Sequence, residues 1–273
     1  LGAALFTWHE LLDEPREPQP QDAQMGSLLG PRFSNDEIRA YLDSVGAVYR
    51  HHEDDEKLVD HIAELIATEH VVGHFSDRAE FGPRALGARS ILGDARSRDM
   101  QATMNLKIKF RESFRPFAPA VLREDVDEFF EMRPDENSPY MLLVAPVKDS
   151  KRLPIEEDGA RGLDKLKQVR SSIPAITHVD YSARVQTIDM QHHRRFYEII
   201  QKFKEKTGSP VVINTSFNVR GEPIVNTPED AFRCFMHTNM DALVLENVVL
   251  LKQDQPNAKE IDIDAYLAEF ALD

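Results

Sequence analysis

The chain has 273 residues, 41% of them hydrophobic, and a formal net charge of −14 at pH 7. This length can bury one substantial core, and the acidic balance argues against nonspecific binding to nucleic acid or a membrane surface. The single cysteine, Cys234, permits no internal disulfide and is expected to be a buried structural thiol. No apolar run reaches the roughly 18 residues of a membrane span. No basic signal segment is visible, so we expect a cytoplasmic location.

Hydrophobic periodicity and punctuation predict the secondary structure. In chain order we expect helices over residues 34–42, 54–67, 98–109 and 192–207 and from Thr227, and strands over residues 71–75, 141–147, 184–188, 211–213 and 243–251. Ser34 and Glu37 form a capping box at the first helix, and Gly208 closes the fourth. Strands mixed with helices predict an α/β layered domain.

Three segments outside these elements have a different composition. Residues 13–26 are rich in Pro, Gln and acids, which is typical of linkers. Residues 148–170 have little apolar content and are expected to form a long, partly mobile loop. Residues 254–273 are expected to form an acidic tail that ends in a short apolar helix around Tyr266.

A local reversal of charge marks the candidate site. Between Arg78 and Arg123 the chain carries ten Lys or Arg and four acids, a net charge of +6, whereas the rest carries −20. Glycines and prolines surround several of these arginines, which indicates guanidinium groups held in fixed positions. Planar, bidentate recognition of phosphate or carboxylate requires guanidinium groups in fixed positions. The window is therefore a candidate anion site.

Five ordered motifs, at residues 80–90, 109–119, 178–187, 214–225 and 241–245, resemble the C-terminal half of the O-carbamoyltransferase family. This family includes nodulation, aminoglycoside and cephem carbamoyltransferases, and the resemblance runs from about Leu29 to Lys252. Within it, Lys109-Phe110-Arg111 looks like the Lys-x-Arg signature of the threonylcarbamoyl-AMP synthases. The string from Thr215 to Asn218 looks like their Thr-Ser-Ala-Asn signature.

The resemblance implies a fold and a division into domains. It implies a twisted, open, mixed sheet flanked by helices, of the YrdC-like type, with an extended N-terminal segment. Residues 1–30 are expected to be the remnant of an upstream, sugar-kinase-like domain and a linker. Residues 31–253 are expected to be the YrdC-like domain, and residues 254–273 a tail.

The chemistry implied is activation of carbamoyl phosphate by ATP to a carbamoyl adenylate, for transfer to a hydroxyl of a small-molecule acceptor. Fixed cations offset the repulsion between the phosphates, and such transfers need positioning more than a nucleophilic side chain. Arg84, Lys109, Arg115, Asn214 and Ser216 are the expected catalytic residues. The expected ATP and substrate ligands comprise these five together with Arg111, His178, Arg184, Thr215 and Asn218.

The implied cofactors and partners follow from the same chemistry. Mg²⁺ is expected with ATP, held by phosphates and water, because the motifs contain no tight carboxylate cluster and this chain is expected to supply no metal ligands. An iron-type metal is expected only in the upstream kinase-like domain, which is the expected partner. Neither nucleic acid nor a membrane is expected as a partner.

Two residues depart from the family pattern. Asp77 stands near the expected phosphate site, where its charge is unfavourable unless it pairs with Arg78. Tyr181 stands where glycine is usual, and a tyrosine does not easily adopt a positive φ.

Plainer interpretations remain open beside these. Arg96, Arg98 and Arg123 are typical of a solvated face. Residues 214–216 are also typical of a turn and helix cap, and His178 of a structural histidine. Phe114, Phe117, Phe129 and Phe130 are expected in the core. Two other functions stay open: a threonylcarbamoyl-AMP synthase-like enzyme, and a noncatalytic nucleotide- or RNA-binding module.

Overall fold

The structure is a computed structural model that describes residues 2–17, 22–134, 136–155, 168–256, 258 and 263–270. The described residues form an open, mixed sheet of nine strands in the order β1-β9-β8-β2-β3-β7-β4-β6-β5. Its strands are β1 (Arg50–His51), β2 (Val72–Phe75), β3 (Arg89–Asp94), β4 (Ala118–Leu122), β5 (Leu143–Pro146), β6 (Ser182–Ile188), β7 (Val211–Ser216), β8 (Ala242–Leu245) and β9 (Val248–Leu251). The predicted α/β class with an open mixed sheet is confirmed.

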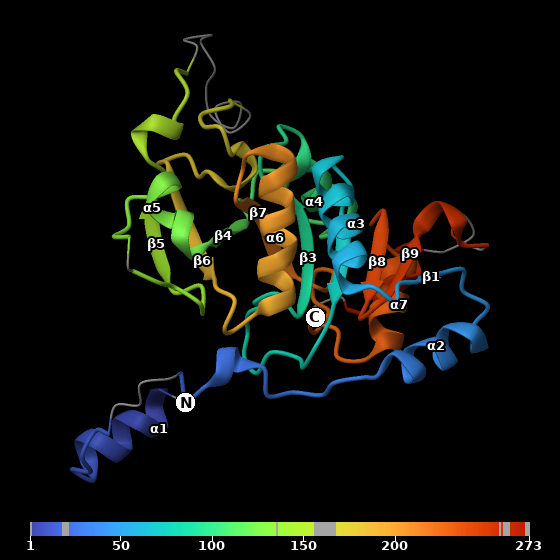
Figure 1. Cartoon of the computed structure of the whole chain (residues 1–273), viewed down its shortest axis with the longest axis horizontal. Coiled ribbons are helices and arrows are strands. Elements are labelled where there is room, and N and C mark those ends of the chain that lie inside the picture. Colours follow the sequence, from blue (N-terminus) through green and yellow to red (C-terminus); the bar gives the residue numbers. More distant parts are fainter. Residues whose placement is uncertain are drawn as a thin grey trace.

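Helices cover both faces of this sheet (Figure 1). They are α1 (Gly2–Phe6), α2 (Asn35–Ser44), α3 (Asp55–Ala67), α4 (Met100–Lys107), α5 (Val126–Phe129), α6 (Arg194–Thr207), α7 (Pro228–Met236) and α8 (Ile263–Ala268). The helices α3 and α6 lie side by side and bury one face, on which Leu92 and Val212 point toward them. The alternate residues Ile91 and Ile213 enter the second core, shared with α2, α4 and α7.

Helix ends lie close to where the sequence predicts them. Ser34 and Glu37 form the expected capping box at the start of α2. The helix α6 ends at Gly208, whose φ of 75° is the left-handed conformation that glycine adopts most readily. A second capping box, between Thr227 and Asp230, begins α7, which buries Cys234 as expected.

The sequence analysis missed two central strands, β3 and β4. The strand β3 begins with Arg89 inside the arginine motif, and β4 contains Pro119, which disfavours a central strand because it has no N–H to donate. Both strands pair with β7. Of the four phenylalanines expected in the core, Phe117, Phe129 and Phe130 are buried, but Phe114 is 45% exposed, so that part of the prediction was wrong.

Both terminal segments contact the sheet domain. The backbone N–H of Phe81 donates to the carbonyl oxygen of Ser27 at 2.7 Å, and the N–H of Gly30 donates to the carbonyl oxygen of Ala79 at 2.9 Å. At the other end, α8 packs on the domain through Tyr266. The expected linker, loop and tail fall partly outside the described residues, at 18–21, at 156–167, and at 257, 259–262 and 271–273. Within the described ranges, none of the helices combines the length and apolar content that a membrane crossing requires.

Candidate functional site

The first arginine motif is a loop organised around the carboxylate of Glu80. One oxygen, Oε1, accepts the backbone N–H groups of Leu86 and Ala88 at 2.7 Å each, and that of Arg89 at 3.3 Å. A carboxylate that gathers several N–H groups fixes the loop between them. The loop carrying Arg84 is thereby held over the start of β3.

Arg89 is the structural arginine of this motif. Its side chain is fully buried, lies 3.5 Å above the ring of Phe75, and donates to the carbonyl oxygens of Ser76, Ala88 and Pro31. These acceptors occupy the two terminal nitrogens of the guanidinium, whereas its buried Nε has no partner among the described residues. The role of Arg89 is to attach residues 31 and 76–77 to β3.

Arg84 and Arg184 form a pair of cations at the other side of the loop. Among the described residues neither makes an ion pair. Burial lowers the pKa of Arg184, and the nearby charge of Arg84 lowers it further. The buried Nε of Arg184 has no hydrogen-bond partner within the described part of the chain. Two adjacent guanidinium groups without a neutralising carboxylate favour an anion between them.

Asn214 lies in the same neighbourhood, on the face of β7 that also carries Ser216. Its Nδ2 donates to Gln186 Oε1 at 2.6 Å and to the carbonyl of Ala85 at 3.3 Å, while Gln186 Nε2 donates to the carbonyl of Leu86 at 2.7 Å. Asn214 Oδ1 is buried and has no partner among the described residues. Asn214 and Gln186 therefore hold the arginine loop, and one acceptor atom remains for a ligand. The sequence analysis missed Gln186, although it stands within a quoted motif.

Lys109 links the second arginine motif to the end of β7. Its Nζ contacts four oxygens: the carbonyl of Ser216 at 2.5 Å, Ser216 Oγ at 3.3 Å, and the carbonyl and Oδ1 of Asn218 at 2.8 Å each. The side chain is buried, and burial lowers the pKa of Lys109 to about 7. Lys109, Ser216 and Asn218 are thus brought together as expected, with the ammonium group among protein oxygens.

Arg111 and Arg115 form a second cationic group beside Lys109. Arg111 Nε donates to Asn105 Oδ1 at 2.6 Å, and its guanidinium lies 4.9 Å from the ring centroid of Phe117. Burial, followed by the charge of Arg115, lowers the pKa of Arg111. Arg115 pairs with Glu112 at 2.9 Å and remains half exposed.

Asn105, on α4, positions this second motif and was missed by the sequence analysis. Its Nδ2 donates to the carbonyls of Gln101, Ser113 and Arg115 at 2.8–3.1 Å, and its own carbonyl accepts the N–H of Arg111. A lone asparagine on an amphipathic helix carries no signal for this role in a single sequence.

Two expected site residues lie apart from these groups. Thr215 alternates with Asn214 and Ser216 along β7, so its side chain points to the opposite face of the sheet. His178 is exposed, and its ring and backbone contact Asp180 and Ser182 within its own turn.

The two departures from the family pattern behave differently from what the sequence suggests. Tyr181 adopts a φ of 63°, which its side chain was expected to resist, and the guanidinium of Arg152 lies 4.7 Å from the ring centroid. Asp77 also has a positive φ of 55°. Its carboxylate lies 3.8 Å from Arg32 Nε, whereas the Arg78 guanidinium donates to the carbonyl of Gly30. The cationic side chain beside Asp77 is therefore that of Arg32 and not that of Arg78.

A cavity of about 450 Å³ separates the first arginine motif from the loop after β7. Its lining includes Gly82 and Pro83 on one side and Asn218 and Glu222 on the other. It therefore opens between the residues that precede Arg84 and those that hold Lys109. Within the described ranges, no cluster of three or more His, Cys, Asp or Glu side chains is placed to hold a metal ion.

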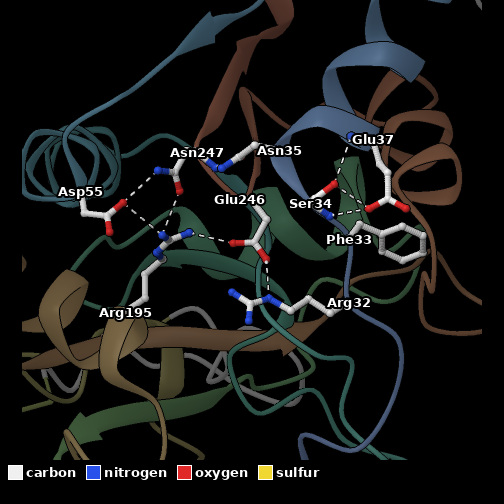
Figure 2. A pocket seen from close by; sticks show the side chains of 9 residues that line it. All are labelled: Arg32, Phe33, Ser34, Asn35, Glu37, Asp55, Arg195, Glu246 and Asn247. Carbon is white, nitrogen blue, oxygen red and sulfur yellow. Dashed lines mark hydrogen bonds and ion pairs between the residues drawn. The ribbon is translucent and has the colours of Figure 1, made fainter.

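A larger cavity, of about 580 Å³, lies between the starts of α2 and α3 (Figure 2). Its central cation, Arg195, donates to Glu246 at 3.0 Å, to Asn247 at 2.8 Å and to Asp55 at 3.2 Å. Figure 2 shows this guanidinium enclosed by its three acceptors. Because these charges neutralise one another, the cavity lacks the unpaired cations of the arginine site.

His74 supports the arginine loop from β2 and predicts a pH effect. Its Nδ1 bonds to the carbonyl of Gly87 at 2.7 Å, and burial lowers its pKa, and that of His193, from 6.5 to about 4. Between pH 4 and 6.5 the unfolded state binds more protons, so we expect the free energy of unfolding to fall as the pH is lowered through this window. Urea unfolding at several pH values would measure it. The His74→Gln variant should show a shallower fall, and an unaltered slope would contradict this assignment.

The fold and the site define an α/β domain with two arginines, Arg84 and Arg184, that make no ion pair among the described residues, and with a buried lysine, Lys109, near Arg111. Residues 63–252 match the family described as "Carbamoyltransferase C-terminus", and the chain belongs to this family. It is 53% identical over 277 residues to protein sll1178 of Synechocystis, covering 100% of this chain and 44% of that protein. It is 37% identical over 256 residues to nodulation protein NolNO of Sinorhizobium fredii, covering 93% of this chain and 34% of that protein.

The chain therefore spans less than half the length of these relatives. The same holds for nodulation protein NolO of Bradyrhizobium diazoefficiens, which is 34% identical over 255 residues, covering 93% of this chain and 42% of that protein. Among solved structures, the chain is similar to full-length HypF in a phosphate- and nucleotide-bound form. The match covers 76% of this chain and 22% of the HypF chain, at 16% sequence identity. Its TM-score of 0.43 marks a distant likeness only.

Proposed function

We propose that this domain activates carbamoyl phosphate with ATP to form a carbamoyl adenylate. Carbamoyl phosphate and water give carbamate and inorganic phosphate, and a carbamate oxygen then displaces pyrophosphate from the α-phosphorus of ATP. Arg84 and Arg184, which make no ion pair within the described part of the chain, carry this proposal, because two guanidinium groups without an acidic partner there suit a ligand with several phosphates. Membership of the carbamoyltransferase family supports the choice of substrate.

The described side chains have distinct roles in this proposal. Arg84, Arg184 and Arg115 neutralise phosphate charge, while the free Oδ1 of Asn214 accepts a hydrogen bond from the amide group of the carbamoyl moiety. Lys109 and Arg111 hold the surrounding backbone and add positive charge. Mg²⁺ would arrive with ATP and take its ligands from phosphates and water.

The chain covers less than half of the length of its relatives. We therefore assign the transfer step to a part of the protein that corresponds to the remaining length of these relatives. In this proposal the remaining part binds a small-molecule acceptor and receives the carbamoyl group at a hydroxyl. The domain described here supplies the activated group.

The proposal is tested by incubating the purified chain with ATP, Mg²⁺ and carbamoyl phosphate and measuring pyrophosphate and inorganic phosphate. We expect both products to appear in equal amounts, and only when carbamoyl phosphate is present. Adding hydroxyl acceptors to this chain alone should give no carbamoylated product by mass spectrometry. ATP turnover that is independent of carbamoyl phosphate, or no binding of either substrate by calorimetry, would show that the proposal is wrong.

A further inference from the structure

The C-terminal helix α8 lies against the loop that follows β7. Tyr266 is 2% exposed, and a Cβ built on Gly221 would lie 2.3 Å from the carbonyl oxygen of Phe270, so the two segments approach closely. The family match ends at residue 252. A helix outside the matched range therefore packs on a motif inside it.

Tyr266 makes ring contacts and a hydrogen bond there. Its ring stacks on His237 with centroids 4.4 Å apart and meets Phe270 edge-on at 5.2 Å. Its hydroxyl donates to Glu222 Oε1 at 2.5 Å. Burial raises the pKa of Tyr266, which keeps the hydroxyl protonated and able to donate. The rings would pack equally well without the hydroxyl, so the hydrogen bond to Glu222 is the specific part of the contact.

Glu222 connects this hydroxyl to the candidate site. Its Oε2 accepts the N–H of Val219 at 2.7 Å, and its backbone carbonyl accepts from Asn218 Nδ2 at 2.7 Å. Asn218 Oδ1 in turn accepts from Ser216 Oγ at 2.7 Å and from Lys109 Nζ at 2.8 Å. A continuous series of hydrogen bonds therefore runs from α8 to the buried ammonium group.

We propose that Tyr266 is a positioning residue of the site, which holds Lys109 in place through Glu222 and Asn218. The effect on catalysis rests on the proposed function, whereas the effect on Lys109 does not. Asn218 bonds both to the backbone carbonyl of Glu222 and to Lys109, so freeing Glu222 loosens the acceptors that enclose the ammonium group.

The test compares the reactivity of two lysines whose ammonium groups are bonded to protein oxygens. Lys252, which is partly buried, donates to the carbonyls of Phe235 and Met236 and shares no hydrogen bond with this series among the described residues. In the Tyr266→Phe variant, which retains the ring, we expect Lys109 to be acetylated by acetic anhydride about tenfold faster than in the wild type. The rate at Lys252, followed by mass spectrometry in the same sample, should be unchanged.

A matched control removes another hydroxyl that donates to a carboxylate. Tyr49 donates to Asp43 at 2.8 Å at the end of α2, and Tyr49→Phe should leave Lys109 as slow as in the wild type. Glu222→Gln is the second variant, and combining it with Tyr266→Phe should add little to either change. An unchanged rate at Lys109, or equal acceleration at Lys109 and Lys252, would overturn the proposal.

Pyrophosphate release separates this inference from the proposed function. If the wild type is active, Tyr266→Phe should lower kcat on the order of tenfold at an unchanged melting temperature, and full activity would overturn the positioning role. If the wild type releases no pyrophosphate, the proposed function fails, and the lysine rates alone decide whether Tyr266 positions Lys109.

Discussion

Replacing Arg84 or Arg184 with glutamine is expected to weaken the binding of ATP and carbamoyl phosphate by about 1.5–3 kcal/mol for each residue. This corresponds to roughly a tenfold to 150-fold rise in Kd. The reason is that neither guanidinium has an acidic partner among the described residues, so its charge is available to a phosphate. Isothermal titration calorimetry of the wild type, both single variants and the double variant would measure the effect.

The matched control for these variants is Arg98→Gln. Arg98 belongs to the same basic window but is exposed before α4. We expect its substitution to change affinity less than twofold, as for other exposed charges. If Arg98→Gln weakened binding as much as Arg184→Gln, a diffuse basic surface rather than the arginine pair would account for binding.

Replacing Lys109 with methionine is expected to lower the free energy of unfolding by about 3 kcal/mol. The substitution preserves the length of the side chain but removes the only charged donor shared by the Ser216 and Asn218 oxygens described above. These buried acceptors would then lose a partner. Denaturant unfolding at pH 7 would measure the change, and a loss under about 1 kcal/mol would contradict this role.

The same variant has a pH signature with a definite sign. The folded-state pKa of Lys109, about 7, lies below the ordinary value of 10.5. Between these values the unfolded state binds more protons, so this lysine makes the wild type more stable as the pH rises from 7 to 10.5. The Lys109→Met variant should lose that contribution, so the stability difference between the two proteins should widen with pH. A difference that stays constant would show that the lysine titrates normally.

Local patterns in the sequence predicted most helices because their signals are local. Ser34 and Glu37 are three residues apart, and Gly208 directly follows an amphipathic run, so each boundary can be recognised without tertiary information. The central strands β3 and β4 lack such signals. A charged residue begins β3 and a proline interrupts β4. Tertiary pairing makes them strands, because β3 lies between β2 and β7 and β4 lies between β7 and β6.

The site was predictable as a set of motifs but not as a geometry. The sequence identified Lys109, Ser216 and Asn218, which the structure joins by direct hydrogen bonds. It could not distinguish the buried Arg89 from the available Arg84, because both stand among glycines and alanines in one motif. That distinction depends on the carbonyl groups that the folded chain places around each guanidinium.

The positive φ of Tyr181 shows a similar limit. Intrinsic preference disfavours this conformation, yet the turn is held by a hydrogen bond from Tyr181 N–H to His178 and another from Val147 N–H to Tyr181. Tertiary contacts from residues 147 and 152 thus outweigh a local preference. No pattern near position 181 in the sequence reports them.

The position of β7 between β3 and β4 has a consequence for synthesis of the chain. Both neighbours are complete by Leu122, whereas β7 begins at Val211 and β8, the partner of β2, at Ala242. Until the ribosome has released these late strands, β3 and β4 have unpaired edges with apolar residues such as Ile91 and Val121, and such edges are prone to aggregate. Contacts between strands so distant in the chain also slow folding. The arginine loop is therefore translated early but acquires its final position only when the last third of the domain has emerged.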